Sequence, residues 1–410
     1  MDTFQENLQK YADLAVKVGV NIQKGQTLVV NAPLTSAEFV RNIAESAYEA
    51  GAKNVHVEWN DETLTRIKYD KAPDEAFKEF PTWKAKGFEE FAENGAAFLS
   101  ITSSNPDLLK GVDPERISNA SKTAGKAMEG YRNYIMSDHN SWSVVAVPSK
   151  AWAEKVFPDT PEDEQEAKLW EAIFQATRVS TGNPVQAWKE HSANLEQKVD
   201  YLNAKHYSKL HYRAPGTDLT IDLPQAHQWV GGISENVKGD HFVANMPTEE
   251  VFTIPHKNGV NGVVSSTKPL SYGGTVIEDF TLTFEEGRII KAEAKQGNET
   301  LQHLIKTDEG AHYLGEVALV PHDSPISNAG IIFFNTLFDE NASNHLAIGN
   351  AYSFCLEGGK TMSKEELEAA GANESVTHVD FMIGSAEMDI DGIKEDGTSE
   401  PVFRKGNWAI

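Results

Sequence analysis

The stretch most able to carry chemistry joins an apolar strand to an acidic loop. Glu316 directly precedes the apolar run 317–320. A carboxylate in a strand that is otherwise buried is costly unless a cation or a hydrogen-bond network holds it. Further along the chain, Glu340 lies in the polar loop 339–344, and His345 follows that loop. Carboxylates and an imidazole at strand ends are the groups that bind divalent cations.

Two further segments supply the same residue types. Residues two apart in a strand point to the same face, so His378 and Asp380 present an imidazole beside a carboxylate. Glu249 and Glu250 begin another extended run and would face opposite ways, so only one of them can join a given site. We therefore predict a cation site assembled from separate strands. Imidazole with carboxylate suits zinc or cobalt, and carboxylate-rich sites also suit manganese and magnesium.

Each pair taken alone has a simpler explanation. His378 and Asp380 can form a structural hydrogen bond, and Glu249 and Glu250 can be a solvated strand start. The sequence also lacks a short metal-binding motif such as HExxH, although that does not exclude a site built from distant strands.

The other candidates have alternatives as well. Glu316 can form a buried ion pair with a basic residue such as Lys268. Glu340 and His345 can be exposed in their loop of small polar residues.

The order of the expected elements places the predicted site in the second half of the chain. Length favours two domains, for which we expect the boundaries 1–200 and 201–410. In the first half, strands alternate with helices, which is typical of a parallel α/β layer; the strands are expected at 27–30, 54–59, 96–101 and 143–148. The second half has short alternating strands, typical of a mixed, largely antiparallel α+β domain, with a hairpin at 280–292 and a helix at 299–306.

Charge and composition restrict the partners and the compartment. With 37 basic and 61 acidic residues the net charge is −24, which argues against nucleic acid or an anionic membrane surface as a partner. The single cysteine, Cys355, excludes an intrachain disulfide and fits a reducing compartment, and its apolar neighbours indicate a packed thiol. The acidic, polar start of the sequence shows no signal-peptide pattern, and no apolar run approaches the length of a membrane span. We expect a cytoplasmic protein.

Four segments together resemble the metalloaminopeptidase family of aminopeptidase T, aminopeptidase S and PepS. They are long, they occur in the family's order, and the resemblance runs along the whole chain; they are 245–253, 315–321, 337–345 and 377–382. The resemblance implies a dimeric exopeptidase with two divalent cations in its C-terminal domain. It implies a bridging and catalytic role for Glu316, a catalytic role for Tyr352, and a ligand set of Glu250, Glu316, His345, His378 and Asp380, with Glu340 as the sixth candidate.

The expected activity is therefore removal of the N-terminal residue from peptides by a water activated between two cations. In this hypothesis Tyr352 donates its phenolic hydrogen to the developing oxyanion, unless it is an ordinary buried tyrosine with a satisfied hydroxyl. Glu249 is a candidate second base or anchor for the substrate's α-amino group.

Two other functions fit the residue types. One is a two-metal phosphoester hydrolase, although lysine and arginine, which bind phosphate, are scarce in the acidic segments. The other is a non-enzymatic acidic protein with structural metals, whose sites would be closed and saturated by ligands.

Overall fold

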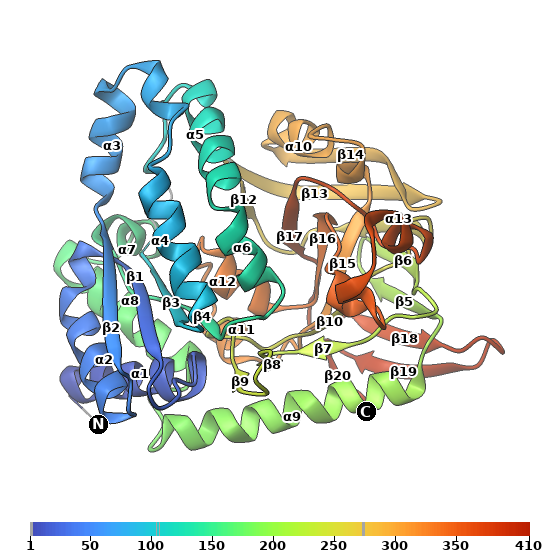
Figure 1. The fold of residues 1–410 in the computed structure, drawn as a ribbon. Helices are drawn as coiled ribbons and strands as arrows, with labels where there is room; N and C mark the ends of the chain where they lie inside the picture. The colour runs from blue at the N-terminus through green and yellow to red at the C-terminus, as the bar shows by residue number, and fades with distance from the viewer. Residues whose placement is uncertain (1–2, 104, 106, 273–274) are drawn as a thin grey trace. The chain divides into compact units, whose positions relative to one another are not determined.

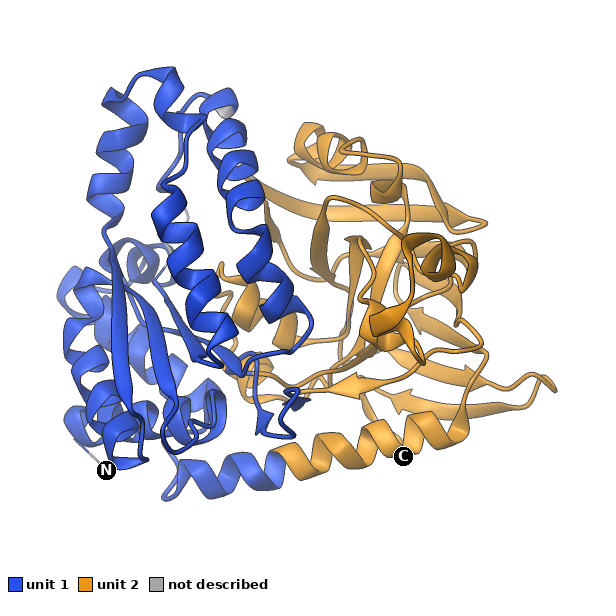
Figure 2. Ribbon diagram, viewed as in Figure 1, with its two compact units in different colours: residues 1–191, 233–247 blue, residues 192–232, 248–410 orange. Residues whose placement is uncertain are grey.

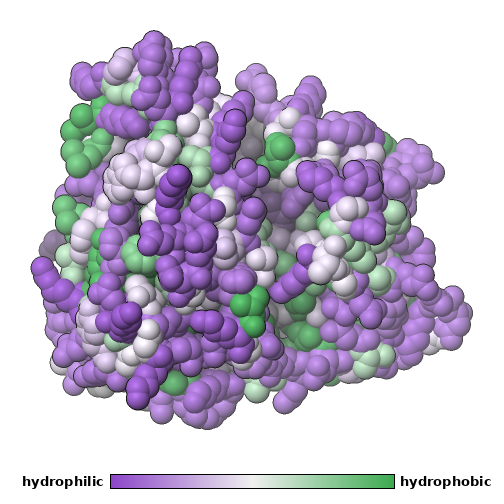
Figure 3. All heavy atoms as spheres, in the orientation of Figure 1, coloured by the Kyte–Doolittle hydropathy of each residue, from purple (hydrophilic) through white to green (hydrophobic). Residues whose placement is uncertain are grey.

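The chain forms two compact units in the computed structural model, which describes residues 3–103, 105, 107–272 and 275–410. Unit 1 comprises Met1–His191 with Ile233–Pro247, and unit 2 comprises Ser192–Gly232 with Thr248–Ile410 (Figure 2). The boundary near His191 falls inside the helix α9, Pro184–Lys205. In the face shown in Figure 3, hydrophilic residues predominate, in keeping with the high negative charge.

Unit 1 contains the predicted parallel α/β layer. Its four strands are all parallel and run in the order β2-β1-β3-β4, with bounds Asn54–Asn60, Thr27–Pro33, Ala97–Thr102 and Trp142–Ala146. The strands form where apolar runs such as Leu28–Val30 are fully buried between helices (Figure 1). The helices are α1 Phe4–Leu14, α2 Ala37–Glu49, α3 Glu62–Lys71, α4 Thr82–Glu93, α5 Pro114–Ala127, α6 Glu129–Met136, α7 Lys150–Val156 and α8 Glu162–Ala176.

In unit 2 every described strand pairing is antiparallel. The larger sheet has nine strands in the order β12-β13-β11-β6-β5-β18-β19-β20, with β14 beside β13. Its bounds are β5 Lys209–Ala214, β6 Thr217–Asp222, β11 Val260–Ser265, β12 Leu270–Tyr272, β13 Thr275–Glu285, β14 Arg288–Gln296, β18 Asp389–Ile393, β19 Ser399–Arg404 and β20 Asn407–Trp408. The predicted hairpin is confirmed as β13 and β14, and the helix after it is α10, Asn298–Ile305.

A smaller sheet of five strands in unit 2 carries the acidic segments. Its order is β17-β16-β15-β10-β7, with bounds His378–Met382, His345–Gly349, Leu314–Leu319, Val251–Thr253 and Val230–Gly231. One face is apolar and joins the core of unit 2 through Val251, Val317, Leu319, Leu346, Ile348 and Phe381. Because side chains alternate along a strand, the residues between these must point to the opposite face.

A bulge sets the register of this sheet at Gly315. Pairing between β15 and β16 shifts between Leu314 and Glu316, and the shift brings Glu316 opposite Ala347. A side chain at Gly315 would lie only 2.1 Å from the backbone oxygen of Asn350, so glycine is needed for this close approach. The remaining short helices of unit 2 are α11 Pro325–Asn328, α12 Thr336–Asp339 and α13 Lys364–Ala369. Within the described ranges, no helix combines the length and the apolar character of a membrane span.

Candidate metal centre

Strand register brings the sequence-predicted residues to one face of the five-stranded sheet. Glu316 pairs with Ala347, and Ala347 pairs with Asp380, so these three residues point to the same side. His345 lies two residues before Ala347, and His378 lies two residues before Asp380, so both imidazoles share that side. The methyl group of Ala347 at the centre leaves room between the longer side chains. The face therefore gathers two carboxylates and two imidazoles from three adjacent strands.

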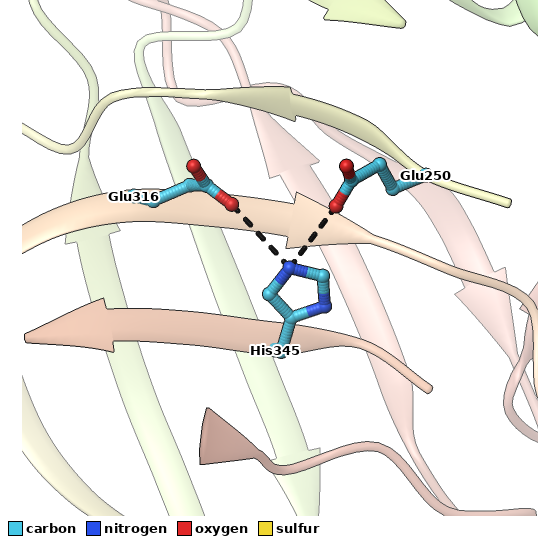
Figure 4. Close-up of side chains that lie close together, drawn as sticks. All are labelled: Glu250, Glu316 and His345. Carbon is cyan, nitrogen blue, oxygen red and sulfur yellow. Dashed lines mark ion pairs between the residues drawn. The ribbon is translucent and has the colours of Figure 1, made fainter. Parts of the chain in front are cut away.

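The first group of candidate ligands is Glu250, Glu316 and His345 (Figure 4). His345 Nε2 lies 3.1 Å from Glu250 Oε2 and 3.3 Å from Glu316 Oε1. All three residues are buried, with exposed fractions of 9% for Glu250, 5% for Glu316 and 1% for His345. One ligand atom from each residue lies within 4.8 Å of the others, which is close enough for a single cation to contact all three.

The second group is Glu316, His378 and Asp380, so Glu316 belongs to both. His378 Nε2 lies 3.6 Å from Glu316 Oε2 and 3.3 Å from Asp380 Oδ1. The two oxygens of Glu316 thus point to different imidazoles, Oε1 to His345 and Oε2 to His378. This is the arrangement that a carboxylate bridging two cations requires.

Backbone carbonyls fix the orientation of both imidazoles. Nδ1 of His378 lies 2.7 Å from the carbonyl oxygen of Asn350, and Nδ1 of His345 lies 3.3 Å from that of Ser343. A carbonyl oxygen can only accept, so each Nδ1 carries the hydrogen and donates it. A neutral ring then turns the lone pair of Nε2 toward carboxylate oxygens, which also carry lone pairs. This contact is unfavourable unless a proton or a metal ion lies between the atoms, and the same carbonyl contact is typical of metal-binding histidines.

The pKa values of the clustered groups reflect the same unfavourable contact between imidazoles and carboxylates. Burial alone would lower the pKa of His345, but the carboxylates of Glu250 and Glu316 raise it well above its ordinary value. Burial would also lower the pKa of His378, but Asp380 and Glu316 raise it to about 9. For Glu316 itself, burial raises the pKa. Without metal, the cluster therefore tends to retain protons that cations would displace.

The donor set fits divalent cations on two further observations. Asp380 Oδ1 is buried and, although it lies 3.3 Å from His378 Nε2, it accepts no hydrogen bond among the described residues. In the same part of the structure, no lysine or arginine forms an ion pair with Glu250, Glu316 or Asp380. Buried carboxylates that the protein does not neutralise itself call for a cation from outside.

Glu340 and Tyr352 lie beside the two groups but in neither of them. Glu340 is half-buried in a 3₁₀ turn, Glu340–Ala342, and burial together with Glu250 and Asp380 raises its pKa well above the ordinary value. The ring of Tyr352 is 4.8 Å from that of His378, centre to centre. Burial, and then the negative charges of Glu316 and Asp380, raise the pKa of Tyr352.

Several of the simpler explanations are wrong. Glu249 and Glu250 are not a solvated strand start, because their exposed fractions are 4% and 9%. Glu316 pairs with imidazoles, and Lys268 is not among its ion-pair partners in the described residues. His345 is not exposed in a loop, since it is the first residue of β16 and is 1% exposed.

Sequence reasoning missed the groups that hold the ligands in place. The backbone carbonyls of Ser343 and Asn350 could not be found, because every residue has one and only the fold selects which of them meets an imidazole. Asn341 was also missed. It is fully buried and accepts a hydrogen bond from the backbone N–H of Glu249 at 2.7 Å. Its place beside Glu340 was the only signal available in the sequence.

A buried sheet face of carboxylates and oriented imidazoles defines the class of the protein as a candidate metalloenzyme. Comparison with known proteins supplies the family. The family model of the thermophilic metalloproteases (M29) matches residues 4–408. Aminopeptidase AmpS of Bacillus subtilis is 63% identical to the chain, and aminopeptidase T of Thermus thermophilus is 44% identical; both alignments cover all of both chains. The structure of wild-type AmpT from Thermus thermophilus superposes with a TM-score of 0.94 over both full chains.

The chain therefore belongs to the thermophilic metalloprotease family, and it is a metalloaminopeptidase. The family resemblance and the aminopeptidase activity predicted from the sequence are confirmed. The phosphoester hydrolase and the non-enzymatic binding protein are not retained as alternatives.

Proposed function

We propose that this aminopeptidase works with two divalent cations that share Glu316. Glu250, Glu316 and His345 would hold one cation, and Glu316, His378 and Asp380 would hold the other. The observation that carries the proposal is the division of the Glu316 carboxylate between two imidazoles, with Oε1 directed to His345 and Oε2 to His378.

The local charge supports two cations rather than one. Glu250, Glu316, Glu340 and Asp380 carry one negative charge each when ionised, which gives −4. Two divalent cations supply +4 and offset these four carboxylates, whereas one would leave an uncompensated −2 in a buried environment. The charge of Glu249 is then left to meet the substrate's α-amino group. Glu340, which lies next to the first group, is our candidate for the sixth ligand.

The imidazole and carboxylate donors favour zinc or cobalt as the metal at both positions. Each group contains one imidazole nitrogen together with carboxylate oxygens. Imidazole suits zinc and cobalt, whereas magnesium prefers oxygen ligands alone. Manganese binds both nitrogen and oxygen ligands, but more weakly than zinc or cobalt does.

The residues of this chain have separate roles in the proposed reaction. When bound, the cations activate water and polarise the scissile carbonyl. Glu316 fixes the spacing of the reacting groups because its two oxygens are held in different directions. Tyr352 is protonated at neutral pH and donates a hydrogen bond to the oxyanion. The apolar rear face of the sheet, with Val317 and Leu346 fully buried, keeps the site rigid and excludes water from behind.

We further propose that the substrates are peptides with a free N-terminus, and that Glu249 is an anchor for the α-amino group. Glu249 and Glu250 both precede β10, which begins at Val251, so the alternation of a strand does not force their side chains to opposite faces, and Glu249 is buried beside Glu250. We also propose that the segment 201–410 is the catalytic domain, that the enzyme is a homodimer, and that it acts in the cytoplasm. The family resemblance supports the dimer, and the buried free thiol of Cys355 is consistent with a reducing compartment.

The test is a metal titration of the chelated enzyme, followed by hydrolysis of an aminoacyl p-nitroanilide. We expect no activity after EDTA, recovery with zinc or cobalt, and two equivalents bound per chain. Anomalous scattering from crystals grown with zinc would then identify the ligands. A single equivalent at full activity, or two equivalents bound away from Glu316, would overturn the proposal.

A further inference from the structure

We propose that Asn341 is a positioning residue for one of the two cations only, the one held by Glu250, Glu316 and His345. This inference rests on the proposed two-cation site. It concerns a side chain that is not itself a ligand candidate and that touches the ligand-bearing segments through hydrogen bonds.

Asn341 connects two segments that supply carboxylates to the site. Its Oδ1 accepts a hydrogen bond from the backbone N–H of Glu249 at 2.7 Å, which fixes the chain directly before Glu250. Its Nδ2 donates to the carbonyl oxygen of Leu337 at 3.1 Å and to Glu340 Oε1 at 3.4 Å. The amide therefore ties the start of β10 to the helical turn that carries Glu340.

The position of Asn341 is itself fixed. The side chain is fully buried, so water cannot replace its partners. The backbone oxygen of Asn341 accepts a hydrogen bond from the hydroxyl of Ser324 at 3.2 Å, which anchors the turn from its other side. Only a side chain with an acceptor and a donor at this distance from the backbone satisfies both Glu249 N–H and Leu337 C=O.

The second group of ligands is positioned without Asn341. His378 is oriented by the carbonyl oxygen of Asn350, and Asp380 is carried by the same strand, β17. Glu316 is set by the pairing of β15 with β16. Loss of the Asn341 amide therefore releases Glu250 and Glu340 and leaves His378 and Asp380 in place, so the two cations should respond differently.

The matched control is Asn236 in unit 1. Asn236 is also buried, at 6% exposure, and it accepts from two backbone N–H groups, those of Lys238 at 2.9 Å and Asp240 at 3.0 Å. It belongs to the other unit and to none of the ligand segments. Asn236→Ala thus reproduces the loss of a buried, hydrogen-bonded amide without touching the proposed site.

The experiment is a calorimetric zinc titration of the chelated full-length wild type, Asn341→Ala and Asn236→Ala, with melting temperatures measured in parallel. We expect two tight equivalents for wild type and Asn236→Ala. For Asn341→Ala we expect one tight equivalent and a second weakened by roughly 10–100-fold, as for other residues that orient metal ligands. Activity of Asn341→Ala should return when zinc is raised by the same factor.

The outcomes separate this inference from the proposal beneath it. If wild type does not bind two equivalents, the two-cation site is wrong. If wild type and Asn341→Ala both bind two equivalents equally tightly and differ only in melting temperature, Asn341 is merely structural. Equal weakening of both equivalents would also overturn the selective role. Should Asn341→Ala fail to fold, Asn341→Ser, which retains a small polar side chain but cannot span both partners, carries the same expectations.

Discussion

Two of the buried acidic sites of unit 2, those around Asp391 and Glu316, differ in the source of their compensating positive charge. On β18 of the nine-stranded sheet, Asp391 is 7% exposed and forms ion pairs with Arg213 and Arg404. Burial would raise the pKa of Asp391, but the two guanidinium groups hold it below its ordinary value. On the five-stranded sheet, the ion-pair partners of Glu316 among the described residues are imidazoles, those of His345 and His378.

The difference distinguishes a site that the protein neutralises itself from the site at which we propose that cations bind. Asp391 forms ion pairs with two arginines of the protein itself, so its charge is neutralised without a metal ion. The cluster around Glu316 lacks such partners among the described residues, so the pKa of Glu316, which burial raises, stays above its ordinary value. A group of several buried carboxylates without a fixed cation is thus the stronger indication of function, because a single one, such as Asp339, can be satisfied by the backbone N–H groups of Phe333 and Asn335.

The largest expected effect is that of Glu316→Gln, which tests the cluster whose carboxylates have no arginine or lysine partner among the described residues. The amide cannot bridge two cations, so we expect kcat/KM to fall by roughly 100-fold or more at saturating zinc. The fold should remain, since the substitution preserves shape and removes a charge that burial disfavours. Peptidase assays and circular dichroism melting measure the two quantities. Near-normal turnover would contradict the role given to Glu316.

Tyr352→Phe separates the chemistry of the site from its metal content. Loss of the hydrogen bond that we propose Tyr352 donates to the oxyanion should lower kcat by about 100-fold with little change in KM. Zinc content should stay at the wild-type level, because the candidate carboxylate and imidazole ligands are unchanged. A drop in bound zinc with unchanged turnover per occupied site would instead make Tyr352 a structural residue.

Asp391→Asn tests the other acidic site, in which two arginines neutralise the carboxylate. Removing the carboxylate leaves two guanidinium groups without their partner, but these are 44% and 39% exposed in their side chains. We therefore expect a loss of about 2 kcal/mol in the free energy of unfolding, less than for a fully buried pair. Activity per folded molecule and zinc content should not change.

The pH dependence of this loss has a definite sign. Folding lowers the pKa of Asp391, so its ion pairs contribute fully to the free energy of unfolding above the unfolded-state pKa of about 3.9. This contribution is lost as the pH falls through the lower pKa of the folded state. Urea unfolding of wild type and Asp391→Asn should differ at pH 7, and the difference should shrink as the pH is lowered below about 3.9. A difference that keeps its size at the lower pH would show that the ion pairs are not its origin.

The smallest effect concerns His227, which shows what burial does to an imidazole without carboxylates. Its Nδ1 lies 2.7 Å from the carbonyl oxygen of Pro224, and His345 and His378 likewise direct Nδ1 to a backbone carbonyl. Nε2 of His227, however, has no hydrogen-bond partner among the described residues. Burial lowers the pKa of His227 to about 4. The unfolded chain therefore takes up the proton first, and wild-type stability is lost as the pH falls from about 6.5 to 4.

His227→Gln removes this titration. Relative to wild type, the variant should gain about 1–2 kcal/mol in the free energy of unfolding on going from pH 7.5 to pH 5. Denaturant unfolding at the two pH values measures the change. A parallel loss in both proteins would assign the acid sensitivity to other groups.

Much of the fold and of the candidate site could be predicted from the sequence, because the signals are local. The alternation of apolar runs with helical segments gave the parallel layer of unit 1, and period-two patterns gave the hairpin of β13 and β14. His378 and Asp380 share a face because they are two residues apart in one strand. Glu316 stood out because its apolar neighbours made a charge there expensive.

What the sequence determined by itself was the kind of chemistry, since residue types and their alternation along single strands are properties of short segments. The tertiary structure decided the partners. Only the pairing of β15 with β16, and of β16 with β17, directs the two oxygens of Glu316 to different imidazoles. Only the fold decides that the ion-pair partners of this carboxylate among the described residues are imidazoles and do not include Lys268. Strand order and register depend on contacts between residues far apart in the chain, and no periodicity within one strand encodes them.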